Sequence, residues 1–194
     1  MTTILHVTAS GRREDSQSRM LSQELVSRLQ EKHNAEVVEC DAADGLPFVN
    51  AAMASGYFTP EEKRTEAQKK AMEPSERLTD QLLAADILVL STAMYNFMIP
   101  AALKAWFDLV VRTHRTVKYT EDGPVGLAGN KKTYLVVATG GTAIDSEDDY
   151  LTPYVKRILK FIGITDVTVI GAAKVFNDPQ EAVNKAREQI KAAV

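Results

Sequence analysis

The chain has 194 residues, a length that suits one domain with a substantial hydrophobic core. Its formal net charge of −3 gives no electrostatic basis for binding nucleic acid or an anionic membrane surface. No apolar run approaches the roughly 20 residues that span a bilayer, and the single cysteine, Cys40, excludes an internal disulfide.

The chain begins with the pattern of a strand, a helix and a second strand. Apolar and β-branched residues predict strands over 3–8 and 35–40, and a buried face at helical spacing predicts a helix over 16–32. Such a unit forms a right-handed parallel crossover. The first ten residues lack the basic start and long apolar region of a signal peptide, so we expect a cytoplasmic protein in which Cys40 is a buried, inert thiol.

The next stretch, 41–59, shows no clean periodicity, although its aromatic residues argue against disorder. Thr59-Pro60-Glu61-Glu62 predicts the start of a helix, because it combines a capping residue, a proline and a following glutamate. We expect Pro74 to interrupt this helix, which then resumes over 75–85.

The stretch from Asp86 to Asp108 organises the rest of the chain. Its continuous apolar run, Ile87 to Leu90, predicts a central parallel strand buried on both faces, and a helix is predicted to begin near Pro100. Between them lies a second loop, Met94-Tyr95-Asn96-Phe97. Its aromatic residues could cap the core or pack on a partner chain. Loops at the carboxyl ends of parallel strands also form the ligand crevice of open α/β sheets.

The remaining elements complete an alternating pattern. An Asp122-Gly123 turn within 115–127 predicts a hairpin, a signal that Pro124 weakens. Further strands are predicted over 133–138 and 167–172, with helices after Thr152 and Asp178. Five strands alternating with helices predict an α/β fold: a three-layer, doubly wound parallel five-stranded sheet in the flavodoxin-like order 2-1-3-4-5, forming a single domain over 1–194.

The first loop, Ser10–Arg19, joins the first strand to the first helix. Hydroxyls and backbone amides meet a helix N-terminus there, which favours a phosphate bound by Ser10, Ser16, Gln17 and Ser18. Neither a Walker sequence nor GxGxxG is present, so a terminal phosphate monoester fits better than a pyrophosphate. The alternative is a solvated loop in which Ser16 only caps the helix.

The third loop, Ala138-Thr139-Gly140-Gly141-Thr142, follows another buried strand. Its glycines let a ligand approach the backbone closely, or they serve a tight turn that needs positive φ. Together the three loops describe a phosphate at the first loop and a flat ring between the second and third. Flavin mononucleotide (FMN) has that shape. No competing chemistry is visible: His6, His33 and His114 show no metal-ligand spacing, and no metal site is expected.

Several of these segments resemble bacterial FMN-dependent NADH azoreductases, also called NADH:quinone oxidoreductases. The matching segments are Met94-Tyr95-Asn96-Phe97 with Pro100 and 103–108, Ser10 with Ser16-Gln17-Ser18, 119–127 and 161–166. The resemblance implies a flavodoxin-like homodimer with FMN contacts at Ser10, Ser16 to Ser18, Met94 to Phe97 and Ala138 to Gly141. One departure is that this chain has Ala138-Thr139 where members of the family read Ser-Arg.

The resemblance also implies a ping-pong reaction in which NADH is the electron donor and quinones or azo compounds are the acceptors. It makes Tyr119 a ring-stacking residue supplied across the interface and Phe161 a substrate wall. We nominate no side chain as a general acid, because the flavin carries the chemistry. The rival functions are a flavodoxin-like electron carrier or other non-catalytic flavin-binding module, and a flavin-free regulatory domain. A carrier is typically shorter and much more acidic.

The hydrophobic pattern after the second loop also predicts a homodimer. Trp106, Phe107 and 109–111 make the helix after the second loop apolar around much of its circumference. A helix that is apolar on several faces needs a second surface to cover it. We therefore expect a partner chain to cover both this helix and the hairpin.

Overall fold

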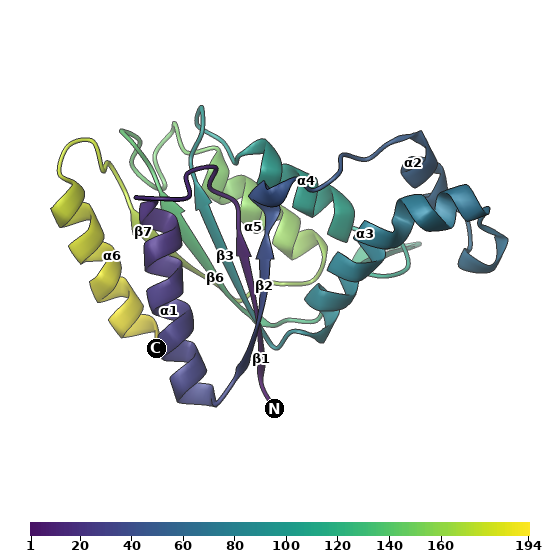
Figure 1. The fold of residues 1–194 in the computed structure, drawn as a ribbon, viewed down its shortest axis with the longest axis horizontal. Helices are drawn as coiled ribbons and strands as arrows, with labels where there is room; N and C mark the ends of the chain where they lie inside the picture. The colour runs from purple at the N-terminus through teal and green to yellow at the C-terminus, as the bar shows by residue number, and fades with distance from the viewer.

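A computed structural model describes all 194 residues. Five parallel strands form one sheet in the order β2-β1-β3-β6-β7 (Figure 1). Their bounds are Thr3–Thr8 for β1, Glu36–Asp41 for β2, Ile87–Ala93 for β3, Lys132–Ala138 for β6 and Val167–Ala172 for β7. The order confirms the predicted 2-1-3-4-5 topology, and β3 is the predicted central strand.

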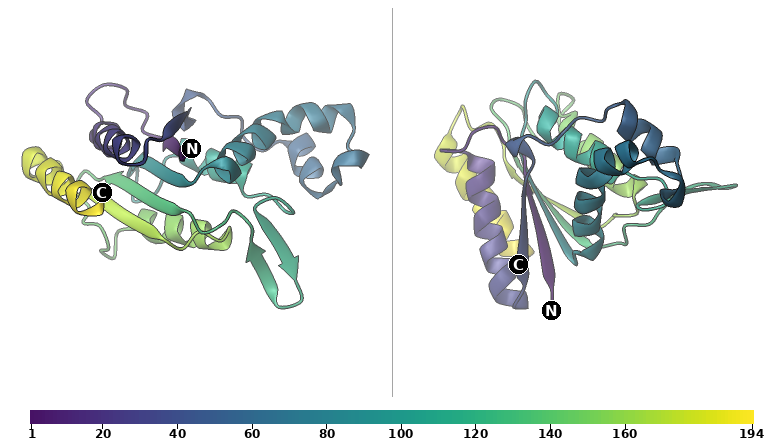
Figure 2. Two further views of the ribbon diagram at one scale, coloured as in Figure 1. Left: turned by 90° about the horizontal axis from the view of Figure 1, so that it is seen from below. Right: turned by 45° about the vertical axis from the view of Figure 1, so that its right-hand side comes forward.

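Helices cover both faces of the sheet (Figures 1 and 2). One face carries α1 (Gln17–His33) and α6 (Pro179–Ala193). The other face carries α3 (Glu66–Ala84), α4 (Ala101–Val110) and α5 (Leu151–Phe161). Successive residues of β1 feed the two cores, because Ile4 packs on the α1 side and Leu5 on the other. No helix has both the length and the apolar character needed to cross a bilayer.

The stretch without periodicity contains two short helices that the sequence pattern did not reveal. A 3-10 turn, η1, spans Ala42–Asp44, and α2 spans Ala51–Phe58 with Asn50 as its N-cap. Two turns are too short to display a convincing apolar period. Gly56 allows α2 to pack closely on α3, since a Cβ at this position would lie 3.0 Å from Met72. The packed pair forms an arm that projects from the sheet (Figure 1).

The predicted helix start at Thr59 is wrong. The Thr59 hydroxyl donates to the Ser55 carbonyl at the end of α2, and only a 3-10 turn, η2, follows at Glu61–Lys63. The capping box lies at Thr65 and Gln68 instead. The predicted break at Pro74 is also wrong, because α3 continues through it. Adjacent tertiary contacts outweigh the lost hydrogen bond; the Ser75 hydroxyl, for example, donates to the Leu109 carbonyl at 2.5 Å.

The hairpin is confirmed, with strands β4 (Val117–Thr120) and β5 (Gly123–Gly126). It extends beyond the layers of the molecule (Figure 2). Its base is fixed against the end of α5, where Gly126 lies so close to the Gly163 backbone that any Cβ would overlap it. Its outer part is open, and Tyr119 is 66% exposed.

The predicted need for a second chain to cover α4 is wrong. Trp106, Phe107, Leu109 and Val110 are all at most 1% exposed within the single chain. The sheet lies on one side of α4, and α3 and its neighbours cover the remaining apolar faces. The hairpin, by contrast, has exposed apolar surface that a partner chain could cover.

Candidate functional site

The three predicted loops meet at the carboxyl ends of β1, β3 and β6, where they surround a cavity of about 120 Å³. The lining includes these predicted residues: Ser10, Ser16, Gln17, Ser18, Met94, Tyr95, Ala138, Thr139 and Gly140. It also includes Arg12, Ala93, Val175 and Phe176, which the sequence did not single out. Asn96, Phe97 and Gly141 are exposed beside the cavity and do not line it.

The hydroxyls of the first loop act as acceptors for the backbone. Ser16 is the N-cap of α1, and its Oγ accepts from the Arg19 amide at 3.5 Å. The Ser10 Oγ accepts from the Arg12 amide at 3.3 Å. The Ser18 Oγ lies 3.4 Å from that of Ser16, and all three serines are buried. A hydroxyl that accepts from an amide still has its own proton to donate, so these groups suit an anion.

Gln17, which lines the same cavity, has an unpaired acceptor. Its side-chain oxygen, Oε1, is buried and has no hydrogen-bond partner in the chain. The backbone amides of Gln17 and Ser18 belong to the first turn of α1, so they cannot bond within the helix. The cavity therefore offers amide donors for an anion and, close by, an acceptor for a hydroxyl.

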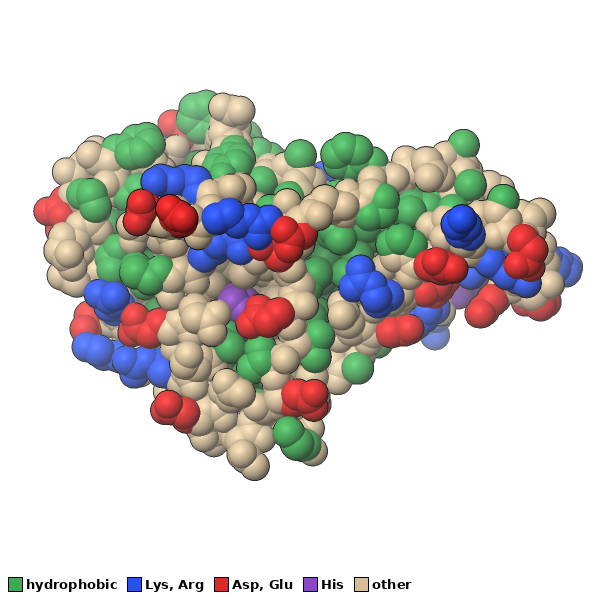
Figure 3. All heavy atoms as spheres, in the orientation of Figure 1, with side chains coloured by type: hydrophobic (Ala, Val, Ile, Leu, Met, Phe, Trp, Pro, Cys, Tyr) green, Lys and Arg blue, Asp and Glu red, His purple; other side chains and the backbone are tan.

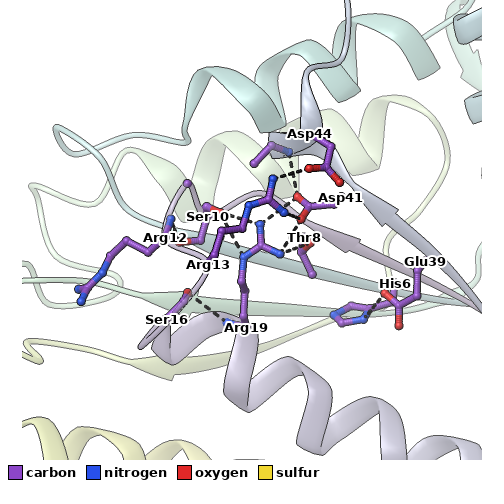
Figure 4. Close-up of polar contacts among 12 residues, drawn as sticks. His6, Thr8, Ser10, Arg12, Arg13, Ser16, Arg19, Glu39, Asp41 and Asp44 are labelled. Carbon is purple, nitrogen blue, oxygen red and sulfur yellow. Dashed lines mark hydrogen bonds and ion pairs between the residues drawn. The ribbon is translucent and has the colours of Figure 1, made fainter.

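A partly buried guanidinium fixes the first loop (Figure 4). The Arg19 side chain donates to the Ser10 carbonyl at 2.7 Å and to the Thr8 hydroxyl at 2.9 Å. It also forms a two-point pair with Asp41, at 2.8 and 2.9 Å. Its charge is thus neutralised, and Arg19 acts as a support for the loop.

Asp41 receives further donors from the loop and from its own backbone. Arg13 bonds to both Asp41 and Asp44, and the Ala43 amide donates to Asp41 at 3.0 Å. Burial raises the pKa of Asp41, but the hydrogen bonds from Arg19 and Ala43 outweigh it and hold the pKa below its ordinary value. Asp41 remains ionised at neutral pH.

The second loop is a tight turn built without glycine. The amide of Tyr95 donates to the Met98 carbonyl at 2.9 Å, and the amide of Met98 donates back at 3.1 Å. Between them Asn96 and Phe97 have φ of 49° and 68°, in the left-handed region that bulky residues rarely adopt. Such strain clusters at functional sites.

Gly140 of the third loop allows a close approach, whereas a Cβ at Gly141 would meet nothing within 4 Å. Neither Gly140 nor Gly141 has a left-handed φ, so the tight-turn explanation is wrong. A Cβ at Gly140 would overlap the ring of Phe176. This ring is carried by the segment Lys174–Phe176, here called the strap, which lies over the third loop.

The two proposed substrate residues lie apart from the cavity of their own chain. Tyr119 is on the exposed hairpin, and Phe161 ends α5, where the Arg157 guanidinium lies 5.7 Å from its ring centroid. Neither lines the cavity. Cys40 is buried, and burial raises its pKa to about 11, as expected for an inert thiol.

A family model described as a flavodoxin-like fold matches residues 2–194. The chain belongs to this family. The flavodoxin-like topology and the position of the cavity agree, since ligands of such sheets bind where the strand order reverses, here between β1 and β3.

Two relatives of this flavodoxin-like chain are named FMN-dependent NADH:quinone oxidoreductase 1. The protein from Hahella chejuensis is 45% identical and aligns with 100% of this chain and 95% of its own length. The protein from Colwellia psychrerythraea is 41% identical over 96% of this chain and 97% of its own. A solved azoreductase from Bacillus anthracis has a TM-score of 0.88, with 31% identity over 100% of this chain and 97% of its own.

Sequence reasoning missed the strap and Arg12. Arg12 lies within the first loop, but only the hydroxyl residues and Gln17 of that loop were predicted to contact the ligand. The strap lies between the last strand and a proline-started helix, where it looked like an ordinary connection. One signal was available, because all strands of a parallel sheet end at the same edge. The loop after 167–172 therefore had to approach the other three.

Proposed function

We propose that this chain is an FMN-dependent NADH oxidoreductase. It reduces quinones by two electrons in a ping-pong cycle and cleaves aromatic azo compounds reductively. The observation that carries the proposal is the cavity itself, where buried serines and the start of α1 meet an aromatic loop. The names of the full-length relatives and of the matching azoreductase structure support it.

The polar part of the cavity fits the phosphate of FMN. The amides of Gln17 and Ser18 and the hydroxyls of Ser10, Ser16 and Ser18 are donors, and the N-terminus of α1 favours negative charge. Glu14 and Asp15 are exposed and do not line the cavity. No carboxylate therefore opposes a phosphate there.

The unpaired Gln17 oxygen fits the next part of the ligand. A buried acceptor without a donor is costly, and the ribityl hydroxyls of FMN are donors. A cavity of about 120 Å³ is smaller than the roughly 300–1,000 Å³ of pockets that enclose a small molecule. We therefore assign the phosphate end to the part of the cavity at the first loop. The ring is assigned to the mouth of the cavity and the surface beside it, at Met94 to Phe97 and Ala138 to Gly141.

When bound, FMN supplies the transfer of two electrons from NADH to the acceptor. The chain's own residues bind and orient. The tight turn of the second loop positions Tyr95, Asn96 and Phe97 beside the cavity, and the backbone of the third loop leaves open space at Gly141. We assign no side chain as a general acid, because the flavin carries the chemistry.

The proposal includes a homodimer with each hairpin over the partner's site. A ring bound outside a small cavity needs a second surface to exclude water, and each hairpin presents Tyr119, Val125 and Leu127 to solvent. Hydrophobic side chains also line the upper edge of the molecule, above the ends of the strands (Figure 3). In such a pair Tyr119 would stack on the partner's flavin and Phe161 would border the substrate. A cytoplasmic location completes the proposal, because NADH is formed there.

The visible spectrum of the purified protein tests the function. A yellow protein whose colour bleaches with NADH without oxygen and returns with a quinone is the proposed enzyme. Bleaching by a reduced protein donor but not by NADH would identify an electron carrier. A protein that is colourless after incubation with FMN and removal of the unbound flavin would be the flavin-free alternative.

A further inference from the structure

Phe176 is a large aromatic side chain held in an exposed position at the mouth of the cavity. It lines the cavity although it is 82% exposed. Its ring edge occupies the space in which a Cβ of Gly140 would lie. The side chain therefore adds little to the hydrophobic core, yet the molecule leaves a gap for it in the third loop.

The strap that carries Phe176 is bound to the third loop along its length. The Lys174 amide donates to the Thr139 hydroxyl at 3.0 Å. The amides of Val175 and Phe176 donate to the carbonyls of Thr139 and Gly140, both at 3.0 Å. Lys174 takes a φ of 57°, in the left-handed region. Exposed connecting segments are normally mobile and have few hydrogen bonds. The backbone that carries Phe176 is instead strained and held by three hydrogen bonds, which indicates that the position of this side chain matters.

Thr139 has a double function in this arrangement. Its hydroxyl accepts from Lys174 and donates to the Thr142 carbonyl. It thereby fixes both the third loop and the strap. Thr139 is also one of the two positions at which the chain departs from the pattern that the family resemblance implies.

The geometry points to Phe176 as a further cofactor-contacting residue: its ring is an aromatic wall of the FMN site, positioned by Thr139 and accommodated by Gly140. This inference rests on the proposed function. Bound FMN would cover apolar surface of the Phe176 ring that is now exposed to water. Stacking of the aromatic faces would add to this.

FMN titration, followed by quenching of flavin fluorescence, tests the wall. Phe176→Ala should weaken FMN binding by about tenfold, because the bound flavin would lose the apolar contact area that the Phe176 ring provides. Phe176→Tyr should restore the affinity, because the aromatic ring is kept. Phe58→Ala is the matched control, since Phe58 is equally exposed, at 82%, but lies on the projecting arm. Its affinity should equal that of the unmodified chain.

A second measurement separates contact from folding. The visible absorption band of bound FMN should shift in Phe176→Ala but not in Phe58→Ala, because only the former changes the ring's surroundings. Thermal unfolding of both apoproteins should be alike, since both side chains are exposed. Equal FMN affinities for the two alanine variants would overturn the inference, and tighter binding by Phe176→Ala would show that the ring obstructs the site. If the unmodified chain binds no FMN, the proposed function fails first.

Discussion

The hydroxyl of Tyr95 accepts a hydrogen bond from the backbone amide of Gly11 at 3.1 Å. The contact ties the second loop to the first across 84 residues of chain. It couples the part of the site assigned to the flavin ring with the part assigned to the phosphate.

Tyr95→Phe removes this link while keeping the ring. A hydrogen bond of this kind contributes about 1 kcal/mol, so FMN affinity should fall by about fivefold. Tyr150→Phe is the control, because Tyr150 is an exposed tyrosine away from the cavity lining. Fluorescence titration of both variants decides the matter, and equal affinities would mean that the Tyr95 hydroxyl does not organise the site.

The serines of the first loop are predicted to hold the phosphate. Ser16→Ala, Ser18→Ala together should weaken FMN by at least about tenfold, since each bond to a charged group contributes roughly 1.5–3 kcal/mol. Ser18→Ala alone separates binding from capping, because only Ser16 caps α1. Ser27→Ala controls for a serine change on the same helix. Unchanged FMN affinity in the double variant, with helix content intact, would exclude the assignment.

Asp41 makes stability depend on pH. Its pKa is lower in the folded chain than the ordinary 3.8, so its contribution is complete above that value. The contribution is lost as pH falls through the lowered folded pKa. Urea unfolding from about pH 6 down to about pH 3 should therefore show a steeper loss of stability in the unmodified chain than in Asp41→Asn. Parallel curves would show that Asp41 is not a source of the acid sensitivity.

Glu76 joins the projecting arm to the base of the hairpin. It accepts from Arg64 at the end of the arm, from Arg112, which is 1% exposed, and from Arg115. Glu76→Gln leaves these guanidinium groups without their shared carboxylate and should cost on the order of 2 kcal/mol of unfolding free energy. Glu66→Gln, an exposed change on the same helix, should cost nothing measurable. Chemical denaturation of both variants provides the comparison.

The shared active site can be tested by complementation. Sedimentation at micromolar concentration should give the mass of two 21.3 kDa chains. At an FMN concentration too low to load the weakened variant Ser16→Ala, Ser18→Ala, that chain still offers an intact Tyr119, whereas Tyr119→Ala still binds FMN. Mixed dimers of these two variants should regain one working site and therefore reduce quinone faster than either variant alone. A monomer that turns over NADH and quinone would contradict the whole arrangement.

The sheet order and the location of the site were predictable because they depend on patterns that operate locally. Buried strands show as apolar runs, as at Ile87 to Leu90, and topology then carries their ends to one edge. Ser16 was identifiable as a cap because capping involves only neighbours along the chain.

The predictions that were wrong concern features that tertiary contacts between distant parts of the chain decide. Thr59 and Thr65 are both plausible caps, and the packing of α2 on α3 decides between them. Pro74 breaks an isolated helix, but tertiary contacts keep α3 continuous. The apolar faces of α4 indicated a partner chain, whereas the chain's own elements bury them. The sequence contained no local sign that Phe176 and Gly140 meet.

The contact between Phe176 and Gly140 constrains which residues can occupy two positions that lie 36 residues apart in the chain. A side chain at position 140 is compatible with this backbone only where position 176 carries a small residue or the strap is rebuilt. The two positions should therefore vary together among relatives. Glycine at position 140 should accompany an aromatic residue at position 176, and a larger residue at position 140 should accompany a small one at position 176. Such an exchange would let the family alter the mouth of the site without disturbing the phosphate-binding serines.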